Sequence, residues 1–138
     1  MKIPFLLIFL SFLTSPLFAQ ELRTGSHDLR IQWIEFNNAK PGTVEVTSIG
    51  KGKYKIKGEQ RDPTRNEYVT IQGTVEVAER KLLFDGKIVS RIESINEGKP
   101  CERVGPQVFR ATGTRKYWRL FEKLNCDGIT TDYIDIFF

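Results

Sequence analysis

The sequence predicts an all-β protein, a small antiparallel up-and-down barrel of about eight short strands. Two observations lead to this prediction. Apolar and polar residues alternate along almost every segment, and Gly, Pro, Asn and Asp separate the segments. Alternation with a period of two is typical of strands that bury one face. We favour a barrel because short turns connect neighbouring strands throughout, and a β-sandwich is the alternative.

The first residues have the order of a secretory signal peptide. Lys2 is followed by a short apolar run, and the small residue Ala19 precedes the expected cleavage site. The apolar run is too short for a transmembrane helix of about 20 residues, and a buried N-terminal helix is the alternative. We therefore expect residues 1–19 to be removed and residues 20–138 to form one exported domain, periplasmic or secreted.

Strands are expected wherever the alternation is unbroken. The apolar phase changes at Ile34, which predicts a bulge in the first strand. Asp85 and Gly86 could close a tight hairpin, although one continuous strand is the simpler interpretation. A long polar loop is expected at residues 96–106. The expected strands cover residues 28–36, 43–49, 51–60, 67–77, 81–92, 107–112, 115–121 and 131–138.

A short pattern, apolar-x-apolar-x-Gly, occurs four times in the chain. It ends at Gly58, Gly73, Gly86 and Gly113. Glycine weakens a strand unless the sheet bends sharply there, and closing a small barrel requires such bends. The pattern therefore supports a barrel, unless these are ordinary turn glycines.

The two cysteines are expected to form a disulfide. Cys101 and Cys126 both belong to the exported part, and paired cysteines in an oxidising compartment are usually bridged. We expect the bridge to hold the 107–122 hairpin at its base. Free thiols or a metal site are the alternatives, but with His27 as the single histidine a metal site lacks ligands.

Lysines occupy every second position in one predicted strand. These are Lys51, Lys53, Lys55 and Lys57. Because alternate side chains share a face, Tyr54 and Ile56 should point inward and the lysines outward. The row is either the solvated side of an ordinary strand, partly neutralised by acidic neighbours, or a docking surface for anionic sugars, lipid phosphates or acidic proteins.

The segment RKYWRLFEK has large side chains on both faces of its strand. Trp118 and Leu120 share one face, whereas Tyr117, Arg119 and Phe121 share the other. Either another segment, such as residues 20–30, covers this second face, or the face is an exposed contact patch. Tyr, Trp and Arg are the residue types that dominate binding hot spots. Tyr117, Arg119 and Phe121 are therefore candidate binding residues.

Two resemblances concern architecture alone. Trp33 in the first predicted strand is similar to the Gly-x-Trp of lipocalins, but Ile31 stands where their glycine would be. The C-terminal DYIDIFF resembles the last strand of bacterial outer-membrane barrels, which typically ends in an aromatic residue. Predicted strands such as 43–49 and 107–112 are shorter than the 9–11 residues of a membrane-spanning strand, although 67–77 and 81–92 are not, so membrane insertion is not favoured.

No constellation of residues indicates catalysis. Ser26, His27 and Asp28 are adjacent, and adjacent residues in an extended chain point in different directions, so they cannot form a relay. The net charge of +4 is mild, and the chain lacks the clustered basic residues of nucleic-acid binders. No cofactor is expected.

We therefore expect a non-enzymatic binding module for a protein, a glycan or a small amphipathic ligand. The alternatives are an outer-membrane protein or surface adhesin, and an inhibitor of an extracellular hydrolase that uses the 96–106 loop.

Overall fold

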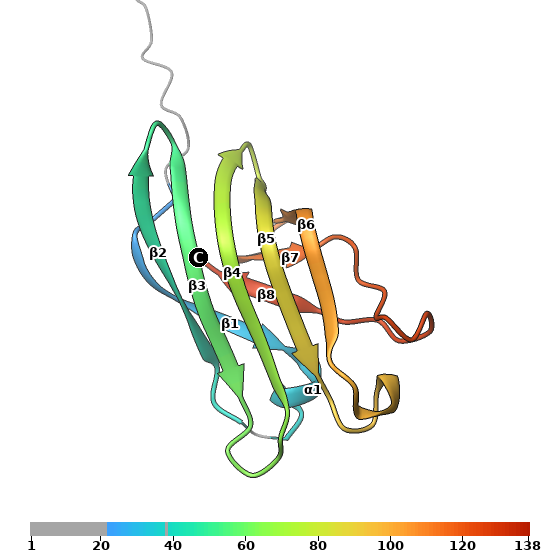
Figure 1. The fold of residues 1–138 in the computed structure, drawn as a ribbon. Helices are drawn as coiled ribbons and strands as arrows, with labels where there is room; N and C mark the ends of the chain where they lie inside the picture. The colour runs from blue at the N-terminus through green and yellow to red at the C-terminus, as the bar shows by residue number, and fades with distance from the viewer. Residues whose placement is uncertain (1–21, 38) are drawn as a thin grey trace, which may run out of the picture.

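The computed structural model describes residues 22–37 and 39–138, which form a closed antiparallel barrel of eight strands (Figure 1). Each strand pairs with the next along the chain, and the last pairs with the first. The predicted all-β up-and-down barrel is confirmed, and closure excludes the sandwich. The predicted signal peptide, residues 1–19, lies outside the described residues. The elements are β1 (Gly25–Ile31), α1 (Gln32–Glu35), β2 (Gly42–Gly50), β3 (Lys53–Arg61), β4 (Tyr68–Ala78), β5 (Lys81–Arg91), η1 (Asn96–Gly98), β6 (Cys101–Arg110), β7 (Tyr117–Leu120) and β8 (Ile134–Phe137).

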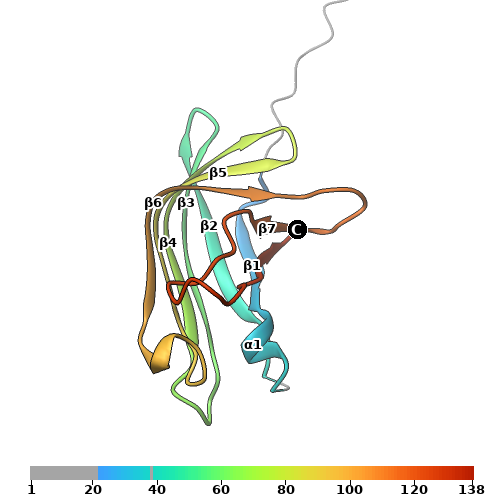
Figure 2. The same ribbon diagram turned by 90° about the vertical axis from the view of Figure 1, so that its right-hand side faces the viewer.

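A line of inward-facing glycines crosses the barrel wall, and Figure 2 shows that β6 bends sharply along its length. Gly73 in β4 pairs with Gly86 in β5, which pairs with Gly105 in β6. A Cβ atom on Gly73 would lie 2.3 Å from a backbone oxygen of β5. Gly58 and Gly86 are crowded in the same way, at 2.2 Å, so a side chain would not fit at any of the three positions, and the bend expected at each stays a prediction. The fourth predicted member, Gly113, is wrong, because it lies in the turn after β6 and Gly105 occupies the equivalent place.

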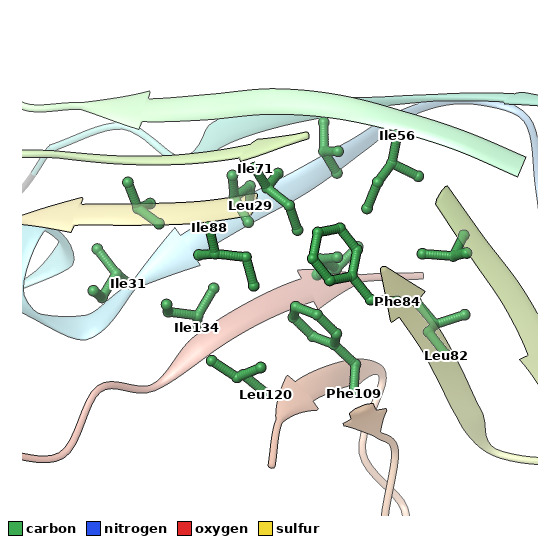
Figure 3. Packing of buried hydrophobic residues seen from close by; sticks show 14 of the residues in the cluster. Leu29, Ile31, Ile56, Ile71, Leu82, Phe84, Ile88, Phe109, Leu120 and Ile134 are labelled. Atoms are coloured by element: carbon green, nitrogen blue, oxygen red, sulfur yellow. The ribbon is translucent and has the colours of Figure 1, made fainter. Parts of the chain in front are cut away.

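Side chains from every strand fill the middle of the barrel (Figure 3). Phe84 and Phe109 meet edge to face with their ring centroids 6.0 Å apart. Leu29, Leu120 and Ile134 are fully buried around them. Small barrels of this kind leave little internal space for a ligand. The middle of the barrel is therefore a packed core rather than a ligand chamber.

The first strand is shorter than expected. β1 ends at Ile31, and the following residues form one helical turn, α1, instead of a bulged strand. The turn places Ile34 three residues after Ile31, on the same side, so both are buried. Trp33 consequently belongs to α1, where its indole N–H donates a hydrogen bond to Asp132. The phase change at Ile34 marked a helical turn, not a bulge.

Three further boundaries differ from the prediction or decide between alternatives. Asp85 and Gly86 lie inside one continuous strand, β5, so no hairpin forms there. The predicted 96–106 loop is mostly wrong, because β6 begins at Cys101 and pairs with β5 over its whole length. Lys51 lies in the turn between β2 and β3, with a φ of 55°, rather than in a strand.

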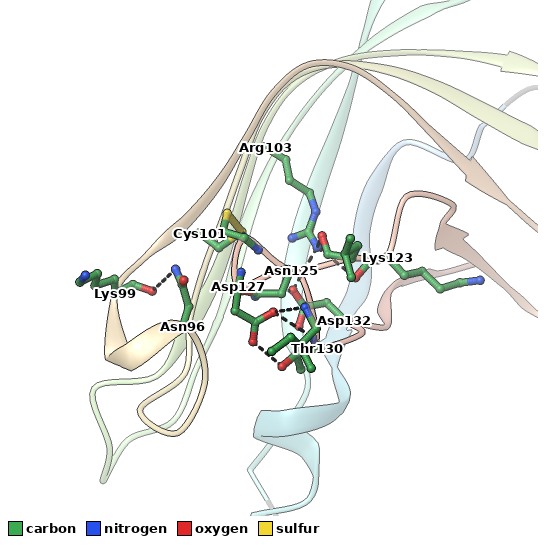
Figure 4. The surroundings of a disulfide bond; sticks show 12 residues. Asn96, Lys99, Cys101, Arg103, Lys123, Asn125, Asp127, Thr130 and Asp132 are labelled. Carbon is green, nitrogen blue, oxygen red and sulfur yellow. Dashed lines mark hydrogen bonds and ion pairs between the residues drawn. A yellow bond between two sulfur atoms is a disulfide. The ribbon is translucent and has the colours of Figure 1, made fainter.

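The predicted disulfide between Cys101 and Cys126 is present (Figure 4). It joins the first residue of β6 to the segment that follows β7, so it fixes this segment beside β6 rather than clasping the two paired strands of the hairpin. Disulfides are typical of proteins in oxidising compartments. In the described part of the chain, no helix is long and apolar enough to span a membrane.

A buried polar cluster lies beside the disulfide. Nη2 of Arg103, inside the barrel wall, lies 3.0 Å from Oδ2 of Asp132, and both side chains are almost completely buried. The Asn125 amide and the Trp33 indole also donate to the Asp132 carboxylate, at 2.9 and 3.0 Å. Arg103 donates in addition to the Leu124 carbonyl oxygen. These contacts hold residues 123–132 against the barrel.

A candidate recognition surface on the outer face of the barrel

A row of charged side chains crosses the outer face of four strands. Arg30 of β1 pairs in register with Asp135 of β8, Asp135 with Arg119 of β7, and Arg119 with Arg110 of β6. Alternation sends all four side chains outward, because the neighbours of Arg119 along β7 point to the core. Aromatic rings flank this row. We call the whole set the arginine–aromatic face; it comprises Arg30, Arg110, Tyr117, Arg119, Phe121, Tyr133, Asp135 and Phe137.

Arg119 is the most constrained side chain of this face. Its Nε and Nη2 donate two parallel hydrogen bonds to the Asp135 carboxylate, at 2.8 and 2.9 Å. The hydrogen bond to Asp135 raises the pKa of Arg119 above its ordinary value, so the guanidinium is always charged. The guanidinium carbon also lies 4.3 Å from the ring centroid of Tyr133 and 5.1 Å from that of Tyr117. The charge, the orientation and the stacking of Arg119 are therefore fixed together.

Arg30 is held in a similar way at the other side of the face. It pairs with Glu35 at 2.9 Å and with Asp28 at 3.3 Å, and it stacks on the Phe137 ring at 4.6 Å. The ring of Phe137 in turn lies 5.0 Å from that of Tyr117. A continuous strip of stacked groups thus joins β1, β8 and β7.

Phe121 and Arg110 extend the face over β6. Phe121 follows β7 and is 46% exposed. Its backbone N–H donates to the Val108 carbonyl oxygen, and the Arg110 guanidinium covers its ring at 3.9 Å. The Nε atom of Arg110 is buried without a hydrogen-bond partner among the described residues.

All three residues predicted from RKYWRLFEK come together on this face. Tyr117 and Arg119 are half-buried and Phe121 is exposed. Tyr133 and Phe137 provide their ring contacts, instead of the N-terminal segment expected as a cover. The opposite face of the strand points inward as predicted, with Leu120 fully buried and Trp118 packed against the core.

The lysine row is only partly formed. Lys53, Lys55 and Lys57 are exposed on the outer side of β3, opposite the buried Tyr54 and Ile56, as predicted. Lys51 lies outside the row, since it occupies the preceding turn.

Acidic neighbours face the row from both adjacent strands. Lys53 pairs with Glu76 of β4 at 3.3 Å, and Lys57 lies opposite Glu45 of β2 in the register. This partial neutralisation favours a solvated strand face over a dedicated anion surface.

The Ser26, His27 and Asp28 side chains diverge. Ser26 donates to Glu45, and Asp28 pairs with Arg30 on the outer face. His27 points inward and is buried, with its ring nitrogens at hydrogen-bond distance from two backbone carbonyl oxygens. Residues 22–37 and 39–138 assemble no group of His, Cys, Asp or Glu that could hold a metal ion.

The fold and this surface define a class of protein: a small closed β-barrel with a disulfide and an organised arginine–aromatic outer face. The chain belongs to the PM1083 family, whose sequence profile matches residues 14–138. A relative is the uncharacterized protein PM1083 of Pasteurella multocida (strain Pm70), 42% identical over 116 residues that cover 83% of this chain and 72% of the relative. No solved structure matches the chain. Neither name states an activity or a ligand, so the function has to come from the geometry of this chain.

Sequence reasoning missed most of the arginine–aromatic face. The five residues that were not among the predicted site residues are Arg30, Arg110, Tyr133, Asp135 and Phe137. A signal existed, because Tyr133, Asp135 and Phe137 share one phase of the last predicted strand. Their position beside Arg119 depends on the pairing of β7 with β8, which the sequence does not state.

Proposed function

We propose that this protein is an exported, non-enzymatic binding domain that recognises a protein partner through the arginine–aromatic face. The disulfide supports export, because such bonds persist in oxidising compartments, as does the signal-like order of residues 1–19. On this proposal the domain acts in the periplasm or outside the cell.

The observation that carries the proposal is the fixed position of Arg119. Two hydrogen bonds to Asp135 and the rings of Tyr117 and Tyr133 hold its guanidinium before any partner arrives. Ordering a long side chain on binding costs about 0.5–1.5 kcal/mol, and a side chain that is already ordered avoids most of that cost. Tyr and Arg are also the residues that dominate binding hot spots.

The charges of the face indicate the chemistry of the partner. The cross-strand row has three arginines, and Lys81 of β5 continues it by pairing with Arg110. Asp135 is the one acidic member of that row, although Asp28 and Glu35 balance Arg30 from the side. A partner surface with exposed aromatic groups and several carboxylates would complement this arrangement, and opposite charges would speed its docking.

Site-specific photocrosslinking tests the proposal in the compartment where the protein resides. A photoreactive phenylalanine analogue replaces Tyr133, whose side chain is 38% exposed within the face, and in a matched strain it replaces Ile129, which is 85% exposed. We expect a discrete crosslinked protein from position 133 and not from position 129. Arg119→Ala should abolish the crosslink.

Two controls separate loss of binding from loss of fold. Tyr117→Ser and Phe121→Ser should leave thermal unfolding within a few degrees of the wild-type value and still abolish the crosslink. Unfolding of these variants would show that the two residues belong to the core. Identical crosslinks from positions 133 and 129, or none from either, would contradict recognition through this face.

A second candidate function is inhibition of an extracellular hydrolase through residues 96–100. One observation favours it: Asn96 and Glu97 both adopt left-handed backbone conformations in η1, and the loop ends at the bridged Cys101, which fixes its base. Inhibition assays against lysozymes and proteases, with Glu97→Gly as the matched variant, test this candidate. Absence of inhibition across the panel would set it aside.

A further inference from the structure

One open end of the barrel contains a pocket that the arginine–aromatic face does not include. It lies between the start of β1, the β4–β5 turn, the β6–β7 turn and the end of β8, and its volume is about 460 Å³. This volume is within the range of small-molecule sites. The residues that line it are Arg23, His27, Val77, Glu79, Arg80, Ala111, Trp118 and Phe138.

The wall of this end pocket is apolar and partly aromatic. The rings of Trp118 and Phe138 lie 4.4 Å apart and are tilted by 58°. Val77 and Ala111 complete the apolar part of the lining. Trp118 also packs on the core, so the wall continues the interior of the barrel outward. Such a wall would bind the apolar body of a small molecule.

The rim of the end pocket carries positive charge in fixed positions. Arg80 donates from Nε to the Ala111 carbonyl oxygen at 2.6 Å and from Nη2 to that of Gly113 at 3.2 Å. Arg23 donates to the Ser26 carbonyl oxygen at 2.8 Å. Within residues 22–37 and 39–138, neither guanidinium forms an ion pair with a carboxylate, and Glu79 is the acidic side chain of the lining.

His27 adds a buried polar group at the floor. Its Nδ1 lies 2.7 Å from the Phe137 carbonyl oxygen and its Nε2 lies 2.6 Å from that of Arg23. Nη2 of Arg23 also lies 3.4 Å from Nδ1, so the ring is held between two backbone carbonyl oxygens and a rim arginine. The two rim guanidiniums, Arg23 and Arg80, therefore favour a negative charge in the pocket.

We propose that this end of the barrel binds a small amphipathic anion, with its charged head between Arg23 and Arg80 and its apolar body against Trp118 and Phe138. The inference concerns residues outside the arginine–aromatic face and does not depend on the protein partner proposed above. The middle of the barrel is packed, so a small amphipathic ligand would bind in this end pocket rather than inside the barrel.

Fluorescence titration with 8-anilinonaphthalene-1-sulfonate, a small aromatic anion, tests the proposal. We expect saturable binding, and about tenfold weaker binding of the uncharged analogue N-phenyl-1-naphthylamine. Arg23→Gln and Arg80→Gln should each weaken binding of the sulfonate about tenfold, because each removes a charged hydrogen-bond donor. Arg61→Gln is the control: it removes an exposed arginine at the last residue of β3, outside the pocket, and should change the affinity for the sulfonate less than twofold.

Two more variants keep the test decisive if Arg80→Gln disturbs the turn that Arg80 anchors. Val77→Phe fills the pocket with apolar volume and should abolish binding of both probes. Tyr133→Ser, on the arginine–aromatic face, should leave binding unchanged.

Several results would overturn the proposal. One is equal affinity of the protein for the two probes. Another is a loss of sulfonate affinity in Arg61→Gln as large as that in Arg23→Gln and Arg80→Gln. A third is a loss of sulfonate affinity in Tyr133→Ser. Flotation of the protein with phosphatidylglycerol vesicles without binding of the free sulfonate would also overturn it, because the charged end would then bind a lipid surface.

Discussion

Arg103 and Asp132 form an ion pair inside the barrel wall, with 3.0 Å between Nη2 and Oδ2 and side chains that are almost fully buried. Asp132 is also the acceptor for Trp33 of α1 and for Asn125 next to the bridged Cys126. One carboxylate therefore joins three parts of the chain that are separated in sequence: α1, β6 and the segment after β7.

Arg103→Met should destabilise the protein by about 3–5 kcal/mol, because it leaves the buried Asp132 carboxylate without its cation. The double variant with Asp132→Asn should recover part of this loss, since no uncompensated charge then remains. Urea unfolding followed by tryptophan fluorescence measures both. The exposed pair of Arg61 and Glu59 provides the control: Arg61→Met should cost less than about 1 kcal/mol. Equal costs for Arg61→Met and Arg103→Met would contradict the structural role assigned to the buried pair.

The disulfide should contribute about 3.5 kcal/mol, because Cys101 and Cys126 are separated by 25 residues and the bond restricts that loop in the unfolded chain. Replacing both cysteines by alanine should lower the free energy of unfolding by this amount. Reductant should destabilise the wild-type protein and leave the double variant unchanged. A difference below about 1 kcal/mol would show that the buried polar cluster alone fixes the segment after β7.

Gly73→Ala should destabilise the barrel by about 2–3 kcal/mol or more, since the added Cβ would lie 2.3 Å from a backbone oxygen of the neighbouring strand. Thr74→Ala, on the outer side of the same strand, should change stability by less than about 0.5 kcal/mol. Thermal unfolding of the two variants gives the comparison. If Gly73→Ala were as mild as Thr74→Ala, the close approach of β4 and β5 at this position would not need glycine.

Much of the fold could be predicted because alternation alone determines which side of a strand is buried. The prediction of 81–92 differs from β5 by one residue for this reason. The helical turn at α1 could not be read, since the burial of Ile31 and Ile34 fits a bulge as well as a turn. The alternation contained a signal for the buried ion pair that the sequence analysis did not use. Arg103 is in phase with the inward Phe109, and Asp132 is in phase with the inward Ile134. Each is a charged residue at an inward position of the alternation, and the fold brings the two together.

The candidate face was predictable to the extent that it belongs to one strand. Alternation placed Tyr117, Arg119 and Phe121 on one side without any knowledge of their neighbours. The position of Asp135 beside Arg119 depends on the pairing of β7 with β8, which the long segment 121–133 connects, and on the closure of β8 with β1. Register of this kind is set by the whole barrel and is not contained in any single segment.

Stability should fall in acid partly through Asp127. The hydroxyl of Thr130 and the backbone N–H groups of Thr130 and Ile129 donate to this carboxylate and lower its pKa below its ordinary value. A carboxylate with a lowered pKa in the folded state adds stability that is fully present above the unfolded pKa of about 3.9 and is lost as the pH falls through the folded pKa.

Asp127→Asn should therefore lower the melting temperature at pH 7 and flatten its decline between pH 5 and pH 2. Thr130→Val should change the melting temperature and its pH dependence in the same direction but by less, because it removes the hydroxyl donor and keeps the carboxylate. Asp85→Asn, on the exposed outer side of β5, is the control and should leave the melting curve unchanged in shape. Circular dichroism gives the melting temperature of each protein across this pH range. If the melting temperatures of Asp127→Asn and of the wild-type protein declined in parallel with falling pH, the hydrogen bonds to this carboxylate would not favour its charged form.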